Sequence, residues 1–428
     1  MEQRFPNKTA QGERVLRVLP AFRAVTVRFF AQRPPAVCFV LLLFFGVLTF
    51  FFCVMAGGER TFLGIFHAQG DTLFSDFFRS VRDAATGSAV YSEHRVIYPP
   101  LANAVFWLIS RVMPAAYLEV PAAQWSTWHF YPAAVLGISF FLCLSLVLFA
   151  GVLGREPYPR PLRLLLSFFL AASFPMLFLI ERGNLVLLCL VALIVYSQNY
   201  GSDSAVAREV GLFALAVATA LKIYPLLFGL PLVRERRWRD VAHAATYALL
   251  LFFIPSFFFG GPWFCAKWLV KNTVYYSNYA GRGAISQLTA WGISATLARA
   301  VIYAGYAVLL LFVILSALLQ RKPFKAWALC AATLLAVPSI FSAYNWVLML
   351  PALLAFLRTE RLVGRNILWF FLMATPFFVF VPKAYQDNGL IALIGGIIAL
   401  SVFESVALLR RRSRENMRKR GEKPYYTL

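Results

Sequence analysis

A short stretch early in the chain holds many acidic and basic side chains: DTLFSDFFRSVRDAATGSAVYSEHRVIYPP, residues 71–100. Asp71 and Asp76 carry carboxylates, which can remove a proton from an incoming hydroxyl group. Arg79 and Arg95 carry fixed cations, which can bind a phosphate group and stabilise its charge as it leaves. This combination suits transfer of a group from a phosphate-activated lipid to a hydroxyl.

Further polar side chains follow at the ends of apolar runs. Glu181, Arg182 and Asn184 belong to a short ERGN turn, and Lys222 and Tyr224 end a later apolar run. Singly, each has a structural interpretation: Glu181 and Arg182 could pair with each other, Lys222 could extend to lipid headgroups, and the early arginines could hold lipid phosphates. Together, acids and several cations favour a phosphate- and substrate-binding site. Five more residues complete the predicted set: His94, Tyr98, Arg282, Gln287 and Asn345.

The composition indicates a membrane protein. Of the 428 residues, 60% are hydrophobic and only 14% are charged, which is far from the composition of soluble globular domains. Many apolar runs are long enough to cross a bilayer, and no long polar stretch could fold as a separate domain. We therefore predict one transmembrane domain, residues 36–409, between a basic N-terminal segment, 1–35, and a basic, disordered tail, 410–428.

The formal net charge of +22 is carried by short Lys and Arg clusters at the ends of apolar runs. This pattern indicates membrane topology and contact with anionic lipid, and not binding of nucleic acid. With these clusters in the cytoplasm, both termini are cytoplasmic and the protein is expected in the plasma or inner membrane. About twelve spans fit this all-α polytopic fold: 36–56, 129–150, 163–180, 184–199, 206–222, 223–233, 241–259, 299–319, 326–342, 345–357, 366–382 and 389–409.

Residues 57–128 then form one large external loop. Within it, residues 100–113 are apolar but short, carry Arg111 and are bounded by prolines, so we expect a juxtamembrane helix on the outer face. The predicted spans 223–233 and 345–357 are also short and contain proline, which is typical of helices that line a cavity shared with water. With this topology, the candidate site residues all lie on the external side.

The chain lacks the common signatures of nucleotide, metal and serine-hydrolase sites. The patterns GxxxxGK[ST], GxGxxG after a strand, HExxH and GxSxG do not occur, and the four histidines are dispersed. Five of the six cysteines fall in apolar runs without metal-ligand spacing. We predict no cofactor and no metal; the pairs of acids leave binding of a divalent cation open.

Five segments in a fixed order resemble the GT-C glycosyltransferases of the DUF2029 or GT87 family, which includes polyprenol-phosphate-mannose-dependent mannosyltransferases. In chain order these are SDFFRSVRDAATGSAVY, YPPLAN, ERGN, ALKIYPLLFGLPLV and RERRWRD. The resemblance covers about residues 36–385. It implies an all-helical GT-C fold with juxtamembrane helices in the first external loop and an active site on the extracytoplasmic face.

The resemblance also implies a reaction. A polyprenyl-phosphate donor would give its sugar, mannose or another hexose or pentose, to a hydroxyl of a lipid-linked or cell-envelope glycan, with inversion and an aspartate of the first loop as base. Asp76 matches the family's aspartate, and Asp71 is a competing candidate. Many members carry a histidine near the turn after the ninth span, whereas this chain has SAYNW there, residues 342–346, and so departs from the family pattern.

Alternatives remain at two levels. Asp76 is expected to begin an amphipathic helix whose Phe77, Phe78 and Val81 face the membrane, but as the first residue of a helix it could act only as an N-cap. The whole protein could instead be a transporter or flippase of a lipid-linked or anionic substrate, or a non-catalytic scaffold for envelope assembly. A transporter would place charges near mid-span and often has repeated halves, and the sequence shows neither.

Overall fold

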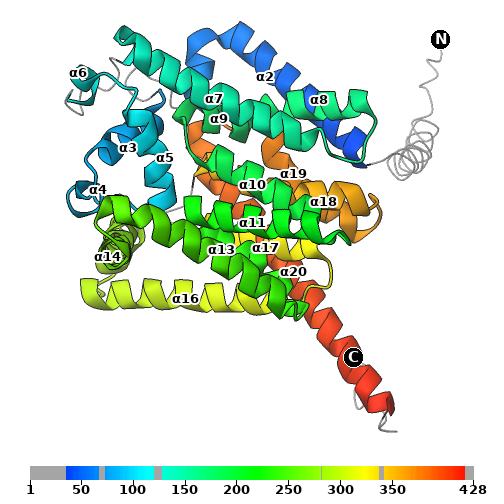
Figure 1. The fold of residues 1–428 in the computed structure, drawn as a ribbon. Helices are drawn as coiled ribbons and strands as arrows, with labels where there is room; N and C mark the ends of the chain where they lie inside the picture. Colours follow the sequence, from blue (N-terminus) through cyan, green and yellow to red (C-terminus); the bar gives the residue numbers. More distant parts are fainter. Residues whose placement is uncertain (1–34, 67–72, 120–127, 281, 337–341, 420–428) are drawn as a thin grey trace, which may run out of the picture.

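The structure, a computed structural model, describes residues 35–66, 73–119, 128–280, 282–336 and 342–419 (Figure 1). All of the regular structure within these ranges is helical. In chain order the helices are α2 (Pro35–Ile65), α3 (Ser75–Ala85), α4 (Ala89–Ser92), α5 (Pro100–Ser110), α6 (Ala115–Leu118), α7 (Pro132–Leu153), α8 (Arg160–Ala171), α9 (Phe174–Arg182), α10 (Val186–Asn199), α11 (Ala205–Leu221), η2 (Tyr224–Gly229), α12 (Leu230–Arg234), α13 (Trp238–Ser256), η3 (Phe257–Phe259), α14 (Pro262–Ala280), α15 (Arg282–Ala290), α16 (Ala295–Leu319), α17 (Pro323–Ala336), η4 (Ala343–Met349), α18 (Leu350–Thr359), α19 (Arg365–Phe378) and α20 (Lys383–Lys419).

Several of these helices can cross a membrane. In the described residues, five are long and apolar enough: α2, α7, α13 together with η3, α16, and α20 as far as Arg410. A sixth crossing results if α8 and α9, which meet at a bend of 57°, form one span. An all-helical, multi-pass membrane protein is therefore confirmed. The count of twelve stays a prediction, because helices such as α10 and α17 have only 14 residues each.

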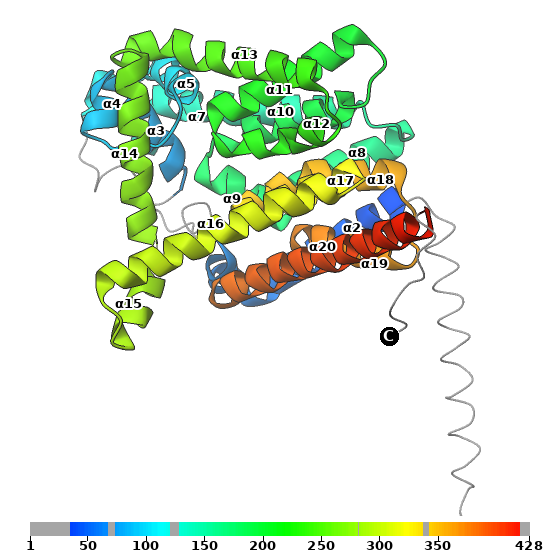
Figure 2. The ribbon, with the colours of Figure 1, turned by 90° about the horizontal axis from the view of Figure 1, so that it is seen from below.

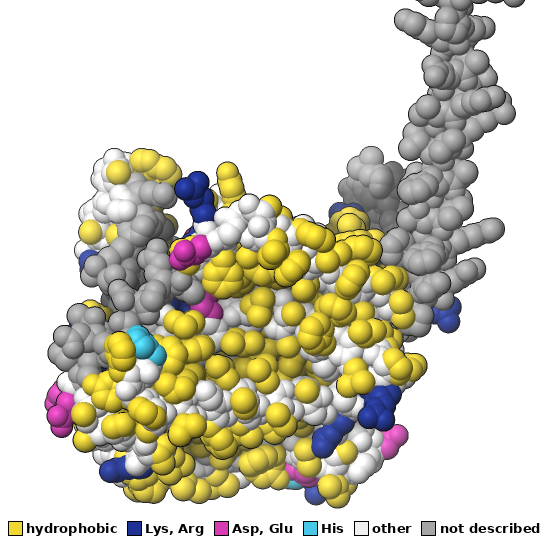
Figure 3. Space-filling view, turned by 90° about the horizontal axis from the view of Figure 1, so that it is seen from above, with side chains coloured by type: hydrophobic (Ala, Val, Ile, Leu, Met, Phe, Trp, Pro, Cys, Tyr) yellow, Lys and Arg dark blue, Asp and Glu magenta, His cyan; other side chains and the backbone are white. Residues whose placement is uncertain are grey.

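The helices form three layers (Figure 2). One layer contains α10, α11 and α13, the middle one α16, α17 and α18, and the third α2, α19 and α20. Every residue of α18 from Leu350 to Leu357 is buried, as expected for a helix that is apolar on all sides. Hydrophobic side chains cover most of one outer face (Figure 3). Leu136, Phe140 and Val147 of α7 are among the large hydrophobic side chains that are exposed. Such a broad apolar surface fits contact with lipid.

Helix α3 of the first loop packs against other helices of the protein. Phe77, Phe78 and Val81 of α3 are at most 2% exposed, and Phe77 contacts the rings of Phe106 on α5 and Phe141 on α7. The prediction that these three residues face the membrane is therefore wrong, because α5 and α7 cover the apolar face of α3. The expected short helix within 100–113 is present as α5.

The C-terminal tail also differs from its prediction. Helix α20 does not stop at the end of the apolar run but continues to Lys419, so residues 410–419 are helical and not disordered. Arg, Glu, Met and Lys, which make up most of this segment, are good helix formers and simply extend the preceding turns.

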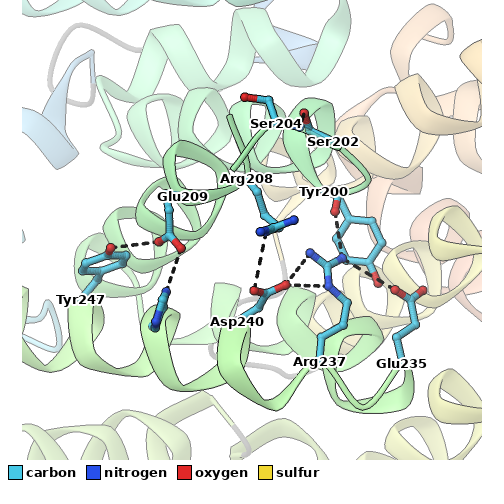
Figure 4. A network of polar contacts seen from close by, with 10 residues as sticks. Tyr200, Ser202, Ser204, Arg208, Glu209, Glu235, Arg237, Asp240 and Tyr247 are labelled. Atoms are coloured by element: carbon cyan, nitrogen blue, oxygen red, sulfur yellow. Dashed lines mark hydrogen bonds and ion pairs between the residues drawn. The ribbon is translucent and has the colours of Figure 1, made fainter. Parts of the chain in front are cut away.

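A polar network joins α11 to α13 at the end of α11 that is distant from Lys222 (Figure 4). Asp240 is bound by Arg237, at 2.6 Å, and is approached by Arg208, while Arg237 also donates to the backbone oxygen of Tyr200. On the next turns, Glu209 accepts a hydrogen bond from Tyr247. The RERRWRD segment is thus part of a contact between helices.

A buried ion pair fixes the end of α18. The Glu156 side chain is fully buried and accepts from Nε and Nη2 of Arg358, at 2.7 and 2.8 Å, and from Gln198 at 2.8 Å. These contacts join the segment after α7 to α10 and α18.

We expect Arg358→Met to lower the free energy of unfolding by about 3–5 kcal/mol, because Glu156 would stay buried without its cation. Denaturant unfolding of the purified protein in detergent measures the change. Arg239→Met, which removes an exposed arginine, is the matched control and should shift stability by less than about 0.5 kcal/mol. Equal shifts in the two variants would contradict a structural role for the pair.

Candidate active site

The site begins where the first loop meets the ERGN turn. Phe74, in a left-handed conformation (φ 57°), donates its backbone N–H to the carbonyl oxygen of Glu181 at 2.8 Å, and α3 starts at the next residue. Gly183 ends α9 with φ 61°, and a Cβ there would lie 2.8 Å from the Cβ of Phe77. Glycine is therefore needed for both the turn and the close approach of α3.

Two side chains of the ERGN turn hold the carboxylate of Asp76. Arg182 Nη2 lies 2.5 Å from Oδ1, and Asn184 Nδ2 donates to Oδ2 at 2.7 Å. The amide of Asn184 is itself oriented, because its Oδ1 accepts the backbone N–H of Val186 at 3.0 Å. Both oxygens of Asp76 are thus directed to the turn, and Phe74 occupies the cap position, so the N-cap interpretation of Asp76 is wrong.

The SAYNW segment reaches the same cluster through Tyr344. Its hydroxyl lies 3.5 Å from Asn184 Nδ2, and its ring contacts Phe178 of α9. Asn345, the next residue, is buried at the start of η4. A tyrosine hydroxyl of the SAYNW segment therefore lies near the amide that binds Asp76.

Lys222 lies at the end of α11, with its ammonium 4.0 Å from the ring centroid of Tyr98. A cation above an aromatic ring is attracted by the ring's quadrupole. Lys222 therefore has an interaction partner within the protein, in contrast to the interpretation that it extends to lipid headgroups. The carbonyl oxygen of Tyr98 accepts hydrogen bonds from Tyr91 at 2.9 Å and from Asn103 at 3.3 Å. Tyr224 follows two residues after Lys222 and opens η2.

An open cavity of about 160 Å³ lies beside Asp76. Arg79, Asp83, Tyr98 and Tyr276 line it, and Arg79 Nη2 donates to the hydroxyl of Tyr276 at 3.5 Å. The cavity joins α3 to α14 and the YPP segment, and it has both cationic and carboxylate walls. Such a space can admit a polar substrate next to the carboxylate of Asp76.

Asp83 was not among the predicted site residues, yet it lines this cavity. Its carboxylate lies 3.4 Å from Nδ1 of His94 and 3.7 Å from Nε of Arg79. Burial raises the pKa of the Asp83 carboxyl above its ordinary value, against the opposing effect of these neighbours and Arg82. Its spacing from Asp76, seven residues, places both on one face of a helix and could have identified it.

The remaining predicted residues fall into two groups. Arg95 lies 4.5 Å from the ring centroid of Tyr275, next to the cavity residue Tyr276, and Glu181 is buried in the last turn of α9. Outside the described part of the structure lie Asp71 and the side chains of Arg282 and Gln287. Among the residues that the structure describes, no group of three His, Cys, Asp or Glu side chains could hold a metal ion.

Comparison with known proteins gives one result. The sequence model of glycosyltransferase family 87 matches residues 97–338, which is more than half of the 428 residues and includes Tyr98, the ERGN turn and Lys222. No curated protein and no solved structure matches the chain significantly. The prediction from the five ordered segments is confirmed: this chain belongs to glycosyltransferase family 87.

Proposed function

We propose that the protein transfers a sugar from a polyprenyl-phosphate donor to a hydroxyl of a lipid-linked or cell-envelope glycan, with inversion and with Asp76 as general base. One observation carries the proposal: a carboxylate held by an arginine and an amide, beside an open polar cavity, in a membrane glycosyltransferase. The base needs access to water and acceptor, whereas the donor's lipid tail stays in the bilayer.

In the proposed reaction, the acceptor oxygen attacks the anomeric carbon of the donor and its proton passes to Asp76. The bond from that carbon to the phosphate oxygen breaks, and the polyprenyl phosphate leaves with both electrons. Arg182 and Lys222 stabilise the leaving phosphate, because arginine can bind two of its oxygens and lysine adds a point charge. Arg79 and Arg95, on the side of the cavity, add further positive charge for the leaving phosphate. The proposed reaction requires no cofactor, and it is compatible with a bound divalent cation.

The ion pair between Arg182 and Asp76 gives this reaction an order of events. Without donor, Arg182 neutralises the carboxylate at 2.5 Å. A donor phosphate competes for the same guanidinium, and its arrival would leave Asp76 bound by Asn184 alone, with its Oδ1 free to take a proton. The base would then become available only when the donor is bound.

The direct test is purified protein in detergent, supplied with a panel of polyprenyl-phosphate sugars and glycolipid acceptors. Formation of a glycosylated product together with free polyprenyl phosphate is expected for at least one donor. The opposing result is that no donor is consumed while a fluorescent polyprenyl-phosphate lipid crosses the bilayer of proteoliposomes. That result would replace transfer by the transport of a lipid-linked substrate.

The proposed site is extracytoplasmic and both termini are cytoplasmic. In intact cells, and with the exposed Cys53 and Cys143 replaced by serine, Ser88→Cys should react with an impermeant thiol reagent and Ser202→Cys should not. The reason is that short loops rich in arginine, such as residues 155–163, are retained on the inside. Labelling of Arg160→Cys from outside would contradict this topology.

A further inference from the structure

A second polar cavity lies at the far end of helices η4 and α18 from the candidate active site. Helix η4 starts beside the site with Tyr344, and α18 carries the chain away to Glu360, which contacts Lys322 just before α17. Around this far end, the beginnings of α17 and α19 and the last described side chains of α20 surround an open cavity of about 160 Å³.

The cavity has an excess of positive charge. Arg321, Lys322, Lys325 and Arg365 line it, against a single acidic lining residue, Glu404. Lys325 is mostly buried and pairs with Glu404 at 2.5 Å, and Lys322 pairs with a glutamate outside the cavity at 2.6 Å. Arg321 and Arg365 are exposed, and neither has a carboxylate at ion-pair distance within the described ranges. Two cations are therefore left to bind an anion.

The shape and surroundings of the cavity favour a phosphate group as that anion. Helices α17 and α19 both begin at it, so the positive ends of two helix dipoles add to the arginines. Arginine can bind two oxygens of a phosphate at once. The chain that follows the apolar part of α20, RRRSRENMRKR, is basic, so electrostatic repulsion disfavours it as the ligand of the cavity.

The location of the cavity, at the end of a candidate membrane span, favours a lipid as the source of that phosphate. The cavity lies beside the end of the candidate membrane span Lys383–Arg410 of α20, and Ala407 and Leu408 form its apolar edge. Headgroup phosphates of a bilayer lie at the ends of membrane spans, and basic pockets between membrane helices are typical sites for anionic lipids. We propose that this cavity binds the phosphate headgroup of an anionic phospholipid, with Arg321 and Arg365 as its main contacts.

Thermal unfolding of the delipidated full-length protein in detergent tests the proposal, with dioctanoyl phosphatidylglycerol as the anionic probe and dioctanoyl phosphatidylcholine as the neutral one. The wild type should be stabilised by phosphatidylglycerol in a saturable way and much less by phosphatidylcholine. The double variant Arg321→Gln/Arg365→Gln should need at least about tenfold more phosphatidylglycerol, since each charge-assisted contact is worth about that factor.

The matched control is Arg236→Gln/Arg239→Gln, which removes the same charge from two exposed arginines outside the cavity and should keep the wild-type response. If the double variant does not yield folded protein, Arg365→Gln alone is measured against Arg239→Gln. A variant that responds like its control overturns the site. Inorganic phosphate that stabilises the wild type as well as phosphatidylglycerol does, through the same arginines, overturns a lipid as the ligand.

Discussion

Asp76→Asn is expected to lower the rate of sugar transfer by about 10² to 10⁴-fold, the usual loss when a general base is removed. The amide is isosteric and its oxygen can still accept from Arg182 or Asn184, so the contact between α3 and the ERGN turn should persist. The variant should therefore express and unfold like the wild type, while single-turnover transfer from bound donor is slow.

Two other aspartates, Asp71 and Asp83, must be tested as alternative general bases. Asp71 is the competing candidate from the sequence, and Asp83 lines the same cavity as Asp76 but is paired with Arg79 and His94. We expect Asp71→Asn and Asp83→Asn to retain substantial activity. If Asp76→Asn is near wild type and Asp71→Asn or Asp83→Asn is inactive, the base is that other residue. If all three transfer sugar normally, the proposed mechanism is wrong.

The sequence predicted that the first loop, the ERGN turn and the SAYNW segment lie close together, and in the structure Asp76, Asn184 and Tyr344 do. It could not predict the partners within the site. Glu181 and Arg182 are adjacent in sequence, but neighbouring residues of a helix do not face each other. Arg182 instead binds Asp76, which is 106 residues earlier, and this pairing depends on the position of α3.

The prediction that Phe77, Phe78 and Val81 face the membrane is wrong for a physical reason. The apolar pattern of α3 shows that Phe77 and Phe78 avoid water, and lipid and protein interior are equally apolar, so the pattern cannot tell which one covers them. In the structure, α5 and α7 do. The twelve predicted spans have the same ambiguity, since a short apolar helix such as α17 is buried among other helices.

The second large effect is expected at Arg182 and Lys222. Arg182→Gln and Lys222→Ala should each raise the dissociation constant of a polyprenyl-phosphate donor by about 10 to 100-fold, the range for losing a hydrogen bond to a charged group. Equilibrium binding of a non-transferable donor analogue measures this without catalysis. Arg239→Gln, distant from the cavity, is the control and should bind donor normally. Unchanged affinity in both site variants would leave Arg182 and Lys222 with a structural role.

Asp76→Asn makes the binding measurement more specific, because the proposed order of events requires the donor phosphate to take Arg182 from Asp76. With a neutral amide at that position, the guanidinium has no carboxylate to leave, so donor affinity should equal or exceed that of the wild type even as transfer fails. Weaker donor binding in Asp76→Asn would instead mean that the ion pair at 2.5 Å shapes the phosphate site, and competition for Arg182 would be ruled out. Opposite effects on donor binding from Arg182→Gln and Asp76→Asn would not be explained by loss of structure, since both variants abolish the same ion pair.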